Sequence, residues 1–102
     1  MYSDSALILF SSTRLFIRAL TLCESARLSV RALSVPDAIT LGCGMCLGLT
    51  QDAIEPACQL LQKEGIAGRL YSTHPYNLIK QWKYFSIQRK HYLERRIKSV
   101  DR

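Results

Sequence analysis

Long apolar stretches are missing from this sequence of 102 residues. The first apolar run, residues 6–10, is followed at once by Ser11, Ser12 and Thr13, whereas a helix needs about 20 apolar residues to span a bilayer. No basic segment precedes the run and no cleavage site follows it, so the pattern of a secretory signal peptide is absent as well. We therefore expect a cytoplasmic protein without membrane contact, whose four cysteines are reduced thiols.

The residue patterns of common enzyme sites are also missing. The sequence has no Ser-His-Asp arrangement, no phosphate-binding glycine loop and no evident pair of catalytic carboxylates. Its two histidines, His74 and His91, have no paired nucleophile. These absences favour a carrier or accessory protein over an independent enzyme.

Apolar residues make up 48% of the chain, which is enough for a small core without disulfides. In residues 1–73 their spacing predicts the order strand, helix, strand, strand, helix, strand. The run at residues 6–10 is typical of a buried central strand, and the apolar periodicity after residues 13 and 52 is typical of amphipathic helices. We predict an α+β fold, a ferredoxin-like β-α-β-β-α-β sandwich with both helices on one face of its sheet.

The most informative motif is a pair of cysteines, Cys43 and Cys46, separated by two residues and set among Gly42, Gly44 and Gly48. Two thiols at this spacing can react with one sulfur atom, bind one soft metal ion or react with each other, and thiol pKa values are often lowered in such motifs. We expect the loop to lie at the entrance to a short strand, residues 45–49, on an edge of the sheet. Cys23 and Cys58 lie on the apolar sides of the two expected helices, where cysteine usually packs as a small hydrophobe.

Several segments together resemble a known family. They are residues 6–13, Val35-Pro36, Cys43-Gly44-Met45 and residues 60–66. Over about residues 6–72 the chain is similar to the small bacterial family of selenium/sulfur carrier-like proteins, of otherwise unknown function. The resemblance implies that Cys43 takes up sulfur or selenium as a persulfide-type adduct, and that donor and acceptor proteins are its partners. Cys46 would then attack the adduct, release the cargo and leave a disulfide.

Other uses of the two cysteines stay open at this stage. Two thiolates also suit Cu(I) or Zn(II), although the sequence has no second nearby pair to complete a four-ligand site. A thioredoxin-like redox site is a third interpretation, but that fold needs more strands than this chain has room for. Packing in a glycine-rich hairpin, without any chemistry, is the fourth.

Residues 74–102 have a different character. The formal net charge of +6 comes entirely from the residues after Tyr76, where eight are basic and two are acidic. Leu78, Trp82 and Phe85 recur at spacings of four and three, which predicts a basic amphipathic C-terminal helix. We expect this apolar stripe to pack within the protomer or across a homodimer. Its basic face would then contact RNA or an acidic protein, unless it is simply solvated. That face comprises Lys80, Lys83, Arg89, Lys90, Arg95 and Arg96.

Overall fold

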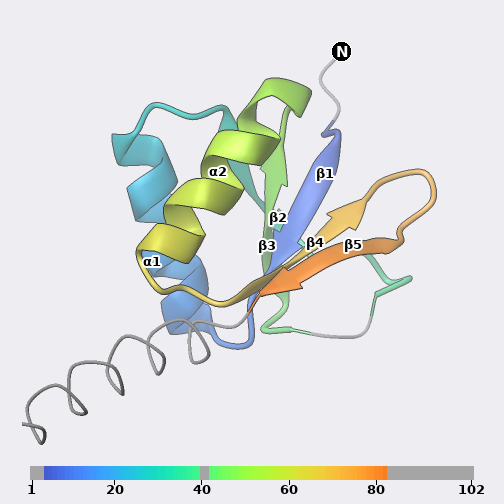
Figure 1. Ribbon diagram of the computed structural model, residues 1–102. Coiled ribbons are helices and arrows are strands. Elements are labelled where there is room, and N and C mark those ends of the chain that lie inside the picture. The colour runs from blue at the N-terminus through green and yellow to red at the C-terminus, as the bar shows by residue number, and fades with distance from the viewer. Residues whose placement is uncertain (1–3, 40–41, 83–102) are drawn as a thin grey trace, which may run out of the picture.

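The computed structural model describes residues 4–39 and 42–82 as an α+β domain, in which two helices cover one face of a five-stranded antiparallel sheet (Figure 1). The strand order is β2-β3-β1-β4-β5. In chain order the elements are β1 Ala6–Leu9, α1 Thr13–Ser25, β2 Val30–Ser34, β3 Met45–Leu49, α2 Gln51–Lys63, β4 Gly68–Ser72 and β5 Leu78–Trp82. Among the described helices none is both long and apolar enough to cross a membrane.

β1 is the central strand, as its uninterrupted apolar sequence predicts. It lies between β3 and β4, with Ile8 opposite Leu47 on one side and opposite Leu70 on the other. All four of its residues are buried. A strand with neighbours on both sides and apolar groups on both faces has no position for a polar side chain, and this is why the sequence of β1 does not alternate.

Both helices form where the apolar spacing predicts them. α1 begins after Ser12, whose hydroxyl accepts a hydrogen bond from the Leu15 amide at 3.3 Å, the usual role of a serine N-cap. Phe16, Ala19 and Cys23 are the buried residues of α1, and α2 buries Ala53, Ala57, Cys58 and Leu61. These side chains and one face of the sheet form the helix-side core.

A second apolar cluster lies on the sheet face that the helices leave open. We call it the far-side cluster. It contains Leu7, Leu9, Ile39, Cys46 and Tyr71, with Leu33, Val35 and Tyr76 packed against it. Ile39 comes from the connection between β2 and β3, and Tyr76 from the connection between β4 and β5. In the described chain, these loop residues contribute apolar contacts on a face that neither α1 nor α2 covers.

The prediction of a C-terminal helix is wrong for its first residues, because Leu78–Trp82 forms the strand β5. This strand pairs with β4, with Trp82 opposite Gly68 and Gln81 opposite Arg69. A spacing of four residues fits one face of a regular strand as well as one face of a helix, so the recurrence of Leu78 and Trp82 does not distinguish them. The free edge of β4 provides backbone hydrogen-bond partners for a strand. The rest of the predicted helix, from Lys83, lies outside the described residues.

The apolar stripe was predicted to be buried, and of its three residues, Leu78, Trp82 and Phe85, this is confirmed for Trp82. Trp82 is buried in the helix-side core. Leu78, by contrast, is exposed to 49%. Phe85 lies outside the described residues, as do Arg89, Lys90, Arg95 and Arg96 of the basic face. Lys80 is described and is exposed on β5.

Candidate functional site

The cysteine loop is held at one end of the sheet by two glycines. Gly42 and Gly44 have φ angles of 94° and 93°, in a region that L-amino acids with a side chain rarely adopt. A Cβ atom on Gly42 would also lie 3.0 Å from the carbonyl oxygen of Phe10. The Val35 amide donates to the Gly44 carbonyl at 3.0 Å, which joins the loop to the end of β2. The sequence therefore fixes the backbone on both sides of Cys43.

Cys43 lies between these glycines and is partly buried. Its thiol is 3.6 Å from the carbonyl oxygen of Met45, within the range of a weak S–H···O contact, and its side chain packs against the helix-side core. The thiol therefore lies at the boundary between the core and solvent. A molecule that approaches this end of the sheet can reach it without unfolding a strand.

Cys46 has a different environment, although it is only three residues further on. It is the second residue of β3, lies opposite Leu9 on β1 and Leu33 on β2, and is fully buried. The expectation that this loop borders an edge strand is wrong, because β3 is flanked on both sides. Burial, with smaller contributions from Asp4 and Cys43, raises the pKa of Cys46 to about 11. At pH 7 only about one molecule in ten thousand would carry a thiolate at this position.

The two thiols of the motif pack against different apolar clusters. Cys43 contacts the helix-side core, whereas Cys46 belongs to the far-side cluster. All four cysteines of the chain are free. In this conformation the Cys46 thiol is fully buried, so attack by Cys46 on an adduct at Cys43 would require Cys46 to become accessible.

The remaining cysteines have the environments expected of core residues. Cys23 on α1 and Cys58 on α2 are both buried. Burial, followed by the influence of Cys58 and Glu24, raises the pKa of Cys23 to about 11. Burial also raises the pKa of Cys58, and Lys80 partly opposes this effect. Within residues 4–39 and 42–82, no three side chains of histidine, cysteine, aspartate or glutamate are grouped so that they could hold a metal ion.

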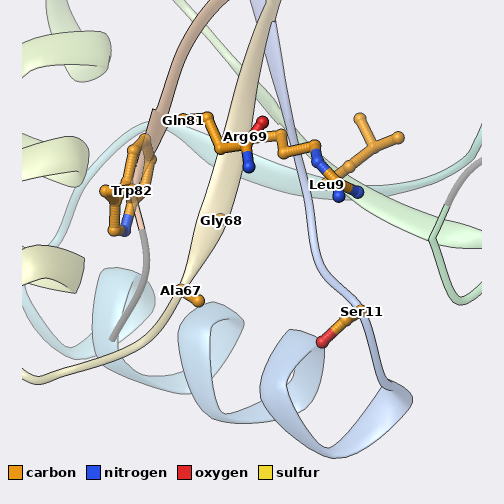
Figure 2. A pocket seen from close by; sticks show the side chains of 7 residues that line it. All are labelled: Leu9, Ser11, Ala67, Gly68, Arg69, Gln81 and Trp82. Carbon is orange, nitrogen blue, oxygen red and sulfur yellow. The ribbon is translucent and has the colours of Figure 1, made fainter. Parts of the chain in front are cut away.

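A small pocket at the same end of the sheet was not predicted from the sequence. Its volume is about 190 Å³ (Figure 2). The lining residues are Leu9, Ser11, Ala67, Gly68, Arg69, Gln81 and Trp82. They come from the end of β1, the start of β4 and the end of β5. No local motif marks them, because only the antiparallel pairing of these strands brings the residues together.

A family model described as "Putative Se/S carrier protein-like" matches residues 5–72. The chain belongs to this family. The match confirms the resemblance inferred from the sequence, and it includes the cysteine loop and every element from β1 to β4. No curated protein and no solved structure matches the chain. In this member of the Se/S carrier-like family, β5 lies beyond the matched region.

Proposed function

We propose that the protein carries sulfur or selenium on Cys43 and passes it to a partner protein. The observation that supports this most directly is a contrast among the four cysteines. Cys23, Cys46 and Cys58 are buried, and Cys43 is the one that is not. It lies within the region matched by the Se/S carrier-like family, on a turn that two glycines hold in place.

The chemistry is an exchange between sulfur atoms. The Cys43 thiolate attacks the outer sulfur of a donor persulfide, so that a new S–S bond forms on Cys43 while the donor leaves as a thiolate. An acceptor thiolate on a partner protein then attacks the outer sulfur of the Cys43 adduct and restores the Cys43 thiolate. Both steps conserve electrons. Selenium transfers in the same way from a selenotrisulfide, in which selenium is bound between two sulfur atoms.

Transfer to a partner fits the geometry better than release by Cys46. The partly buried thiol of Cys43 is accessible from the end of the sheet, whereas that of Cys46 is buried and mostly protonated at pH 7. Release by Cys46 remains a prediction from the motif. It would require a conformation in which β3 opens at Cys46.

We infer that β1 to β4 with the two helices form a ferredoxin-like split βαβ unit, because the strand order β2-β3-β1-β4 and the placement of both helices on one face agree with it. Binding of RNA or an acidic protein by the C-terminal basic residues also remains a prediction. Of those residues the structure describes Lys80 alone.

The test is intact-mass analysis of the reduced full chain after incubation with a small-molecule persulfide, and separately with a selenotrisulfide. We expect an increment of one sulfur atom, or of the selenium-containing group, that is lost in Cys43→Ser and kept in Cys46→Ser. Cys58→Ser is the matched control for a buried thiol. An increment that persists in Cys43→Ser, or its absence from the folded wild-type protein, would disprove the proposal.

A further inference from the structure

The pocket beside Ser11 has the polar character of an anion site. Among the described residues that line it, Arg69 is the one that is charged, and none is acidic. Leu9, Arg69 and Gln81 lie directly opposite one another on β1, β4 and β5, so their side chains emerge on the same face of the sheet. Figure 2 shows the Arg69 side chain extending from β4 toward Leu9. A positive charge therefore lies over the central strand.

The polar side chains of this pocket have no partner among the described residues. In the described part of the chain, the side chains of Arg69, Ser11 and Gln81 make no salt bridge or hydrogen bond. Arg31, by contrast, donates to the Asp4 carboxylate. A guanidinium nitrogen of Arg31 lies 3.0 Å from a carboxylate oxygen of Asp4. A guanidinium, a hydroxyl and an amide can all donate to the oxygen atoms of one ligand.

The pocket is also close to the cysteine loop. Leu9 lines the pocket, and one of its methyl carbons lies 3.7 Å from the position that a Cβ atom on Gly42 would occupy. Gly42 also approaches the carbonyl of Phe10, and the next residue, Ser11, lines the pocket. One side chain therefore separates the pocket from the residue that precedes Cys43.

The volume limits what can bind there. The pocket has a volume of about 190 Å³. Sites for drug-sized ligands and cofactors have volumes of ~300 Å³ or more. The pocket therefore suits an anion of a few heavy atoms.

We propose that this pocket binds the oxyanion end of a small inorganic sulfur donor, of which thiosulfate is the simplest, and so presents the donor's outer sulfur to Cys43. This inference rests on the proposed function of Cys43 and adds a class of donor. The Cys43 thiolate attacks the outer sulfur, the new S–S bond forms on Cys43, and the S–S bond of thiosulfate breaks. The electron pair leaves with sulfite, so no oxidant or reductant is needed. Arg69 binds the sulfonate oxygens before and after the step.

Binding can be measured without the reaction. Trp82 lines the pocket and is the one tryptophan of the chain, so its fluorescence reports on this place. We would titrate full-length Cys43→Ser with thiosulfate at constant ionic strength, with chloride as the reference salt. We expect a saturable change in Trp82 fluorescence, and an increase of about tenfold or more in the half-saturating concentration in Arg69→Gln, because a charge-assisted contact is lost. Arg18→Gln, an equal loss of charge on the exposed surface of α1, should leave the titration unchanged.

Parallel titrations with sulfate and phosphate separate a donor site from a general anion site. Saturation by phosphate but not by thiosulfate would overturn the proposal, as would an unchanged titration in Arg69→Gln. Arg69→Lys keeps the charge and should recover part of the affinity, which provides a second test should Arg69→Gln fold poorly. If thiosulfate binds to Cys43→Ser but forms no persulfide on the wild-type protein, the pocket is an oxyanion site and the proposed donor chemistry fails, whereas the carrier function fails only if a small-molecule persulfide also leaves Cys43 unmodified.

Discussion

The indole N–H of Trp82 donates a hydrogen bond of 2.7 Å to the carbonyl of Ile66, and both residues are buried. This bond connects the end of β5 to the segment that leads into β4. The Trp82 ring also packs closely on Gly68, where a Cβ atom would lie only 3.0 Å from it. Trp82 thus holds the outermost strand against the helix-side core.

Replacement of Trp82 should therefore destabilise the domain strongly. We expect Trp82→Ala to lower the free energy of unfolding by about 3 to 5 kcal/mol, because a large buried side chain leaves a cavity. Trp82→Phe should cost less, since much of the packing remains while the hydrogen bond is lost, a term of about 1 kcal/mol. Denaturant unfolding followed by circular dichroism measures both. An unchanged midpoint for Trp82→Ala would contradict the packing described for β5.

The four cysteines should differ in their rates of alkylation. Cys43 is partly accessible, whereas Cys23, Cys46 and Cys58 are buried and have raised pKa values. Because the thiolate is the reactive form, we expect iodoacetamide to modify Cys43 at least about tenfold faster than any other cysteine at pH 8. Peptide mass spectrometry over a time course gives the four rates, and unfolding in denaturant should make them similar. Modification of Cys46 as fast as Cys43 in the native protein would show that the buried position of Cys46 is not maintained in solution.

The raised pKa of Cys46 also predicts a pH dependence of stability. The protonated thiol is favoured more in the folded protein, where the pKa is about 11, than in the unfolded chain, where it is near 9. This contribution is therefore fully present below pH 9 and is lost as the pH rises toward 11. Unfolding free energies measured across this range should fall less steeply in Cys46→Ala than in wild type. Cys43→Ala, which removes the less buried thiol of the motif, is the control, and equal slopes for wild type and Cys46→Ala would contradict the prediction.

A side chain at Gly48 should destabilise the domain. A Cβ atom there would lie 2.6 Å from the Asp4 carboxyl group and 2.6 Å from a methyl carbon of Leu33. We expect Gly48→Ala to displace both, to disturb the ion pair between Asp4 and Arg31, and to cost about 1 to 3 kcal/mol, as overpacking commonly does. Chemical denaturation measures the loss. In an Asp4→Ala background the same substitution should cost less, and an equal cost in both backgrounds would exclude a clash with Asp4.

Sequence reasoning was most successful where a segment's environment can be read from the segment itself. The unbroken apolar run of β1 requires neighbours on both sides, and the periodicity around Phe16 and Ala57 requires a helix with one buried face. The family resemblance, carried by short motifs, was also found in this way. These features depend on neighbours within a few residues of one another.

Properties that depend on pairing between distant strands could not be predicted in this way. The burial of Cys46 follows from the position of β3 between β1 and β2, and from a register that places Cys46 opposite Leu9. The spacing of the two cysteines along the chain predicts neither the position of β3 in the sheet nor this register. The conformation of Leu78–Trp82 likewise depends on the available edge of β4. Arg69, which we now place in the pocket, had no sequence motif to mark it.

Part of the wall of the proposed donor pocket lies outside the region that the family model matches, although Arg69 lies inside it. The loop with Cys43 falls within the matched region, whereas Gln81 and Trp82, which form one wall of the pocket, belong to β5, which follows it. On the proposed role of this pocket, we expect a substitution in β5 to change which small anion is accepted while the turn that holds Cys43 stays as it is. Donor preference could thus be redesigned from β5 alone, for example by exchanging Gln81 for a larger or a charged side chain.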